Sequence, residues 1–269
     1  MTFVQLCEVY LSERIVSKHY ACNMRRVAGK CPTITVEAVN RYLRHRSEER
    51  ATGTVRFERA MLLILWKWGY ETEKLPAMPR GIIKVKARRA PTRAWTVEQL
   101  RAVLAATKPL DDRTMRSGAR VGLFLRAWAL LGYETGGRFS DLMQFTASNL
   151  DKDAVSWTQA KTGDPIVRTL SAACLVAVRA MLAESTDGRL IGWACDRRQA
   201  MRIMRGHLDA VGVGGSSKWL RRSGATHIEI EQPGKAKHHL GHRTPGLAES
   251  NYIDWTQVRA NAPRTPELG

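Results

Sequence analysis

Six side chains, spread in order over the second half of the chain, are of the types that bind and attack a phosphate group. They are two arginines, two lysines, a histidine and a tyrosine: Arg138, Lys161, Lys218, Arg221, His242 and Tyr252. An arginine is a permanently charged planar fork that can contact two phosphate oxygens at once. A tyrosine hydroxyl, whose ordinary pKa is ~10, becomes a nucleophile when its proton is drawn off. For a phosphodiester substrate, the set provides both phosphate contacts and a nucleophile.

The motifs of other phosphate chemistries are missing. The sequence has no GxxxxGK[ST] segment, no HExxH pair and no carboxylate cluster with a two-metal layout. We therefore expect no metal, no ATP and no other cofactor. His238, His239 and His242 could be read as a metal trio, but they have no carboxylate or cysteine partner. For His238 and His239 we expect a basic face and a partly packed side chain instead.

The local sequence indicates how these side chains are positioned. Arg138 follows a Gly-Gly turn, beside a helix whose N-cap we expect at Ser140. Lys161 lies at the tip of a hairpin with a Gly-Asp-Pro turn. Lys218 and Arg221 are three residues apart, which puts them on one face of a helix. The glycine before the histidine closes a further helix.

Helical periodicity covers most of the chain. The predicted helices run over residues 3–16, 35–46, 55–68, 97–106, 118–132, 140–146, 171–184, 195–210 and 217–230. Possible capping boxes, Thr2 with Gln5 and Thr96 with Gln99, mark two of the starts. Residues 153–170 instead read as a β-hairpin. The expected fold class is therefore mainly α with a small antiparallel β-sheet.

Composition divides the chain into three parts. Residues 1–74 are predicted to form a helical N-terminal domain. Residues 75–94 contain three prolines and a basic run, and we predict that they are a linker. Residues 95–269 are predicted to form an α+β domain. The helix at 55–68 is expected to bury one apolar face made of Phe57, Met61, Ile64, Leu65 and Trp68.

The chain is strongly basic. It contains 43 Lys and Arg against 25 Asp and Glu, a formal net charge of +18, and its pI is about 10.3. Such an excess in a folded protein indicates a polyanionic partner, in most cases nucleic acid. An anionic membrane surface is the weaker alternative, because no basic amphipathic anchor stands out.

The compartment follows from what the sequence lacks. No apolar run approaches the ~18 residues that cross a bilayer, and no signal peptide is apparent. The five cysteines include no CxxC pair, which favours a reducing environment. We therefore expect a cytoplasmic protein with no membrane partner.

Taken together and in this order, these segments resemble the tyrosine recombinase (phage-type integrase) family. TGGRFSDL at 135–142 is similar to the first box of the family, with Asp141 in place of the usual glutamate, and AKTGDP contains the hairpin lysine. KWLRRSGAT at 218–226 is similar to the second box, and LGH at 240–242 to the third. Tyr252 follows in the window of the nucleophile. Five ordered elements make the resemblance specific, and it covers nearly the whole chain.

The sequence also departs from the family pattern. Lys218 stands where most recombinases have histidine, although lysine is familiar there in the related type IB topoisomerases. The stretch between Thr226 and Leu240 is a couple of residues short, and the step from His242 to Tyr252 is one residue longer than expected. The nucleophile does not depend on that register, since no other tyrosine follows Tyr133.

The resemblance implies a site-specific DNA recombinase or integrase that works through a 3′-phosphotyrosyl intermediate, without metal or ATP. Arg138 and Arg221 would stabilise the transition state, and His242 would donate to the phosphate or assist proton transfer. Lys161 would be the general acid for the leaving 5′-oxygen, and Lys218 would contact the phosphate. Residues 1–74 would be the core-binding domain, and 95–269 the catalytic domain with its C-terminal tail.

The implied partners are double-stranded DNA, further copies of the chain in a tetramer on paired sites, and accessory DNA-bending proteins. The two domains of the family clamp the duplex, and C-terminal elements are exchanged between protomers, for which Trp255 and Val258 are the available anchors. A chain encoded by a phage or another mobile element is implied, and we expect a nucleoid-associated protein in the cytoplasm, which is the host's cytoplasm if a phage encodes it. At this length we expect no additional arm-binding domain at the N-terminus, which mildly favours a simple recombination site.

Two alternatives stay open. A type IB-like topoisomerase would use the same groups to relax supercoils as a monomer, and Lys218 favours this reading. A non-catalytic DNA-binding protein would use the arginines for phosphate contact alone.

Overall fold

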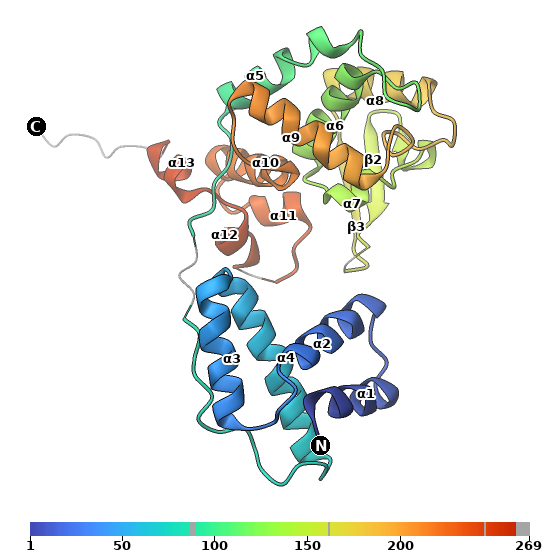
Figure 1. Ribbon diagram of the computed structural model, residues 1–269. Coiled ribbons are helices and arrows are strands. Elements are labelled where there is room, and N and C mark those ends of the chain that lie inside the picture. The colour runs from blue at the N-terminus through green and yellow to red at the C-terminus, as the bar shows by residue number, and fades with distance from the viewer. Residues whose placement is uncertain (87–89, 161, 245, 262–269) are drawn as a thin grey trace, which may run out of the picture. The chain divides into compact units, whose positions relative to one another are not determined.

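The computed structural model describes residues 1–86, 90–160, 162–244 and 246–261. The chain divides into two compact units, Met1–Ala90 and Pro91–Gly269, which we call the N-terminal unit and the C-terminal unit (Figure 1). None of the described helices combines the length and apolar character needed to cross a bilayer.

The described part of the N-terminal unit contains four helices. They are α1 (Phe3–Glu13), α2 (Lys18–Lys30), α3 (Val36–Glu49) and α4 (Thr52–Glu71). The capping box predicted at the start of α1 is present, with the Thr2 hydroxyl accepting from the Gln5 amide and the Gln5 side chain accepting from the Thr2 amide. Helix α2 was not predicted, because its sequence has few large apolar residues to give a periodic signal.

Helix α4 is the centre of this unit and packs against α1, α2 and α3. The predicted burial of Met61, Leu65 and Trp68 is confirmed, but Phe57 and Ile64 are 38% and 39% exposed. The prediction was wrong for these two because α4 is apolar on more than one face. The three neighbouring helices cover a face of α4 that is rotated by about one residue from the predicted face. Other residues of α4 are therefore buried: Val55, Glu58, Leu62 and Trp66.

The first part of the segment predicted as a linker lies against the N-terminal helices. Ile82, Ile83 and Val85 pack on the core of this unit. Asn40 binds the segment with both ends of its amide, donating to the Gly81 carbonyl at 3.0 Å and accepting from the Ile83 amide at 2.9 Å. Residues 87–89, in the basic run, lie outside the described residues.

The C-terminal unit is larger and mostly helical, with one three-stranded antiparallel sheet of order β1-β2-β3 among its described residues. Its longer helices are α5 (Val97–Ala105), α6 (Val121–Thr135), α8 (Ala172–Ala183), α9 (Arg197–Val211) and α10 (Ser217–Glu231). Its short helices are η1 (Lys108–Leu110), α7 (Phe139–Leu142), η2 (Ala147–Asn149), α11 (Ala236–Leu240), α12 (Leu247–Asn251) and α13 (Trp255–Ala260). The strands are β1 (Leu150–Asp151), β2 (Ala154–Thr158) and β3 (Pro165–Thr169).

Helix α6 is the apolar core of this unit and packs against α8 and α10 (Figure 1). It begins at Val121, three residues later than predicted. The preceding residues form a small hairpin with a bridge between Thr114 and Arg120, and Gly118 turns it with φ +87°. The predicted hairpin at 153–170 is confirmed, since β2 pairs with β3 with Trp157 opposite Ile166.

A charged network is buried in the N-terminal unit. Glu58, which is 1% exposed, accepts two hydrogen bonds from Arg46 (3.0 and 2.9 Å) and one from the Tyr42 hydroxyl (2.9 Å). Burial opposes ionisation of the Glu58 carboxyl, but its hydrogen bonds with Arg46 and Tyr42 lower its pKa below the ordinary value. The pair stabilises the unit only while both charges are present.

We expect Glu58→Gln to destabilise the N-terminal unit by roughly 3 kcal/mol, because it leaves the Arg46 charge buried without its main counter-charge. The contribution is complete above the ordinary carboxyl pKa of 4.5 and disappears as the pH falls through the lower pKa of the folded state. Denaturant unfolding at pH 7 and pH 3 measures both effects. Glu71→Gln, which removes an exposed partner of Lys67, is the control and should leave stability unchanged at both pH values.

Candidate active site

Two glycines turn the chain sharply between α6 and α7. Gly136 has φ +58°, a left-handed conformation that favours glycine. A Cβ on Gly136 would lie 2.7 Å from Nε2 of His239, so the position also lacks room for a side chain. Helix α7 begins at Phe139 with Arg138 as its N-cap residue. The predicted N-cap at Ser140 is therefore wrong, because the tight turn starts the helix earlier.

Arg138 is held by a neutral amide and forms only a long ion pair with a carboxylate. Its Nη1 donates to Oε1 of Gln159 at 2.6 Å, and the nearest carboxylate oxygen, on Asp141, is 3.9 Å away. The side chain is 24% exposed, so the guanidinium still faces solvent. A cation that is fixed by a neutral amide keeps its charge for a ligand.

Arg221 is buried in the middle of the unit. It lies one turn after Lys218 on α10, as predicted, but is only 3% exposed, whereas Lys218 is exposed. Its donors bind the carbonyls of Gly136 and Leu240, and it forms no ion pair with any described residue. Burial, opposed by nearby Tyr252 and reinforced by Arg138, lowers its pKa to about 10, so it is still charged at pH 7.

The histidine of the third box is held at the end of α11. Gly241 closes the helix with φ +63°, as predicted, and a Cβ there would collide with Ile166 and lie 2.7 Å from Nε2 of Gln159. The next residue, His242, places its Nε2 3.1 Å from Nη2 of Arg221. An arginine can only donate, so Nε2 accepts and the proton of the neutral ring is on Nδ1.

The His242 ring is therefore a neutral hydrogen-bond donor. Burial, then the charges of Arg221 and Arg138, lower its pKa to about 4. Its Nδ1 is buried and has no hydrogen-bond partner among the described residues. Such an atom can donate to an incoming oxygen.

Tyr252 packs against three of the predicted site residues. Its ring centroid is 4.9 Å from Cζ of Arg221, 5.8 Å from Nζ of Lys218 and 5.1 Å from the centroid of the His242 ring. The tyrosine lies at the end of α12, with its backbone amide donating to the Ala248 carbonyl at 2.9 Å. Four of the six predicted residues thus meet around one ring.

A cavity of about 350 Å³ opens beside this cluster. Its lining comes from the Arg138 turn, the hairpin loop and the segment after α11: Arg138, Thr162, Asp164, Gly241, His242, Arg243, Thr244 and Leu247. Arg243 is paired with Asp164 at 2.6 Å, which ties the hairpin loop to the segment that follows the histidine. Lys161, the sixth predicted residue, lies in this loop but outside the described residues.

Among the described residues, no group of three His, Cys, Asp or Glu side chains is placed to hold a metal ion. The structure therefore does not support a metal site at the three histidines. His239 is 8% exposed, and burial lowers its pKa to about 3. Its Nε2 is close to the positions that a Cβ would take on Gly136 and Gly224, at 2.7 and 2.8 Å. The ring is thus a packing element behind the site, while His238 is exposed.

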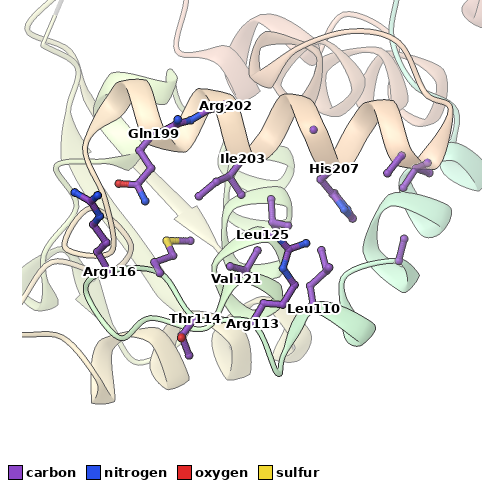
Figure 2. A pocket seen from close by; sticks show the side chains of 15 residues that line it. Leu110, Arg113, Thr114, Arg116, Val121, Leu125, Gln199, Arg202, Ile203 and His207 are labelled. Carbon is purple, nitrogen blue, oxygen red and sulfur yellow. The ribbon is translucent and has the colours of Figure 1, made fainter.

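A larger cavity of about 570 Å³ lies elsewhere, along α9 (Figure 2). It runs between this helix and the segment from η1 to the start of α6, and Figure 2 shows Arg113, Arg116 and Arg202 among the side chains that line it. None of the predicted site residues that the structure describes is part of its lining. Arg138 and His242 line the smaller cavity, and His242 packs on Tyr252, so we place the chemistry there.

Several residues of the site were not singled out from the sequence. Gln159 bridges Arg138 to the Leu240 carbonyl. Thr226, at the end of the second box, accepts from the Asp254 amide at 2.9 Å and lies 3.5 Å from the Tyr252 carbonyl oxygen. Only the spacing of Gln159 from the hairpin lysine could have drawn attention to it.

Helix α9 carries a second overlooked feature. Arg198, Arg202 and Arg205 recur at helical spacing on its exposed face, and none is ion-paired with a described residue. The opposite face is buried through Ala200 and Met204. The repeat of arginines along the helix could have indicated a phosphate-binding face.

No protein-family model matches this sequence, and the search of curated proteins finds no match. Solved structures are similar over the whole chain. A lambda integrase dimer bound to a COC′ core site is 16% identical, with a TM-score of 0.78 over 100% of this chain and 81% of that chain. A lambda integrase tetramer bound to a Holliday junction is also 16% identical, with a TM-score of 0.74 over 100% of this chain and 80% of that chain.

The Tn1549 transposon integrase in complex with circular intermediate DNA is 13% identical, with a TM-score of 0.70 over 99% of this chain and 96% of that chain. These similar structures are tyrosine recombinases. The chain therefore has the tyrosine recombinase fold, and the predicted fold class, mainly α with a small antiparallel sheet, is confirmed.

We expect the pKa of His242 to be about 4 in the DNA-free protein, because burial and two arginines disfavour its charged form. NMR titration of the histidine Cε1 protons measures it. In Arg138→Ala, removal of one positive charge should raise the pKa towards the ordinary 6.5. A value near 6.5 in the unaltered protein would contradict the described environment of the ring.

Proposed function

We propose that this protein is a tyrosine recombinase, a site-specific enzyme that cuts and rejoins DNA through a 3′-phosphotyrosyl intermediate. The observation that carries the proposal is the packing of Arg221 and His242 around the ring of Tyr252, beside a cavity that Arg138 lines. The fold and the ordered sequence boxes support it. The fold alone and the sequence boxes alone would not assign the chemistry, because one fold hosts many functions.

The cleavage step follows from the side chains. The Tyr252 oxygen attacks the scissile phosphorus, its proton leaves to solvent, and the bond from phosphorus to the 5′-oxygen breaks. Arg138 and Arg221 stabilise the charge on the non-bridging oxygens, and His242 donates to one of them from Nδ1. Lys161, assigned from the sequence alone, protonates the leaving 5′-oxygen.

Rejoining is the reverse of cleavage on another strand. A free 5′-hydroxyl attacks the phosphotyrosine, the phosphodiester is restored and the tyrosine takes back a proton. Each step exchanges one phosphoester bond for another, so the reaction needs no ATP. Lys218, exposed and 5.8 Å from the Tyr252 ring, contributes phosphate contact from the solvent side.

The proposed substrate is double-stranded DNA. Residues 1–74 would be its core-binding domain, 75–94 a basic linker and 95–269 the catalytic domain. The net charge of +18 and the exposed arginines of α9 support contact with a phosphate backbone. A tetramer on paired sites follows the example of lambda integrase, which has been solved as a tetramer on a Holliday junction. The protein would act in the cytoplasm, at the nucleoid.

Two competing functions make different predictions. A type IB-like topoisomerase would form the same adduct but join no second site, and Lys218 is the residue that favours it. A DNA-binding protein without catalysis would form no adduct. The residues packed around Tyr252 have no evident purpose in that case.

Covalent trapping tests the proposal. The protein is mixed with nicked duplexes from the DNA that flanks its gene, in EDTA, and quenched with detergent. We expect a protein–DNA adduct that is absent in Tyr252→Phe, because the phenyl ring packs alike but lacks the nucleophilic oxygen. A two-site joining assay then separates recombinase from topoisomerase.

Tyr133→Phe is the matched control, since this other tyrosine of the unit contacts His227 away from the cluster. It should form the adduct normally. Salt-sensitive DNA binding by all three proteins, with no adduct across a library of flanking fragments, would refute the enzymatic function.

Neutralising α9 tests the mode of DNA binding. We expect the triple variant of Arg198, Arg202 and Arg205 to glutamine to bind duplex more weakly. The slope of log K against log salt should flatten by about 0.9 for each phosphate that the variant no longer neutralises. Arg120→Gln, which removes an arginine already paired with Glu184 at 2.9 Å, should keep the slope unchanged. Equal slopes for both would exclude α9 from the interface.

A further inference from the structure

Gln159 has an unusual position for an uncharged residue of a phosphate site. It directly follows β2 and is 1% exposed. Its backbone closes the hairpin loop, because its amide donates to the Asp164 carbonyl at 2.9 Å and its carbonyl accepts from the Gly163 amide at 2.8 Å. The residue is buried, so the polar atoms of its side chain need hydrogen-bond partners inside the unit.

The side-chain amide uses both of its ends. Oε1 accepts from Nη1 of Arg138 at 2.6 Å, and Nε2 donates to the Leu240 carbonyl at 3.0 Å. The Leu240 carbonyl also accepts from Nη2 of Arg221 at 3.0 Å, and the other end of that guanidinium binds the Gly136 carbonyl. Gly136 is two residues before Arg138, so the hydrogen bonds form a closed ring through both arginines.

A carboxamide suits this position for an electrostatic reason. A carboxylate at hydrogen-bond distance would also hold Arg138. It would offset the positive charge that a phosphate needs more strongly than Asp141 does at 3.9 Å, and it would repel the Leu240 carbonyl. An apolar side chain would remove the acceptor of Arg138 Nη1 and would leave the Leu240 carbonyl with Arg221 as its donor. The amide orients the guanidinium and leaves its charge unchanged.

We propose that Gln159 is a positioning residue, which sets the orientation of Arg138 towards the scissile phosphate through the Arg138–Gln159–Leu240 bridge. The inference rests on the proposed strand-transfer function. It assigns a part in the reaction to a residue outside the six predicted side chains. The step it affects is stabilisation of the charge on the phosphate, not departure of the 5′-oxygen.

The test uses two nicked duplexes that differ at one phosphate. One has the ordinary phosphodiester at the scissile position, and the other has a methylphosphonate, which lacks the negative charge. The full-length protein and Gln159→Met, Gln159→Glu and Arg138→Ala are compared for the rate of adduct formation and for duplex affinity. Gln232→Met, at an exposed glutamine beyond the end of α10, is the matched control.

On the charged phosphate, we expect Gln159→Met to lose roughly 100-fold in rate, as for a misplaced catalytic group, with duplex affinity nearly unchanged. Gln159→Glu should lose at least as much, because it keeps the size but neutralises Arg138. On the neutral methylphosphonate, both variants and Arg138→Ala should recover to within a few-fold of the unaltered protein. Gln232→Met should match the unaltered protein on both duplexes.

Other outcomes would overturn the inference. Cleavage of the charged duplex by Gln159→Met at the normal rate would show that the bridge does not orient Arg138. An equal loss on both duplexes would assign Gln159 to folding alone, and thermal unfolding of the same variants identifies that case. If the unaltered protein forms no adduct, the proposed function itself fails and this inference fails with it; a normal adduct with unaffected Gln159 variants overturns only the inference.

Discussion

The site depends on one physical constraint, the burial of Arg221 without a carboxylate partner among the described residues. A buried cation that is not ion-paired needs other hydrogen-bond acceptors, and here the carbonyls of Gly136 and Leu240 accept from Nη1 and Nη2, while Nε has no partner among the described residues. A second cation, Arg138, lies close enough to lower the pKa of Arg221 further. The two charges repel each other, so an anion between them gains from both. The positive potential is thus built into the fold before any substrate arrives.

The close approach of backbone segments makes this burial possible. Gly136, Gly224 and Gly241 each lie where a Cβ would collide with His239, Gln159 or Ile166. His239 fills the space behind the arginines as a neutral ring, because burial and the two nearby guanidinium groups, those of Arg168 and Arg221, lower its pKa to about 3. A cationic residue in its place would add to the repulsion. The glycines give steric room, and the uncharged imidazole adds no electrostatic repulsion. Both therefore allow the two arginines to lie close together.

Much of this could be predicted from the sequence, because the site residues come in motifs with local meaning. A glycine before His242 predicted the helix end, and the spacing of Lys218 and Arg221 predicted a shared helix face. Long-range relations were not predictable. Phe57 and Ile64 of α4 were wrongly predicted to be buried, because the buried face of a helix depends on which other helices pack against it. Gln159 was missed because its partners, Arg138 and Leu240, are 21 and 81 residues away in sequence.

The anchoring of the segment after Tyr252 has a genetic consequence. Asp254, which is 2% exposed, accepts from the Ala94 amide at 3.1 Å, and Thr226 accepts from the Asp254 amide. Val258 of α13 packs on the same chain, so the tyrosine and the arginines around it belong to one polypeptide in this arrangement. For the proposed recombinase, a variant without the tyrosine and a variant without Arg221 would then not complement each other in one cell, because neither polypeptide holds a complete site.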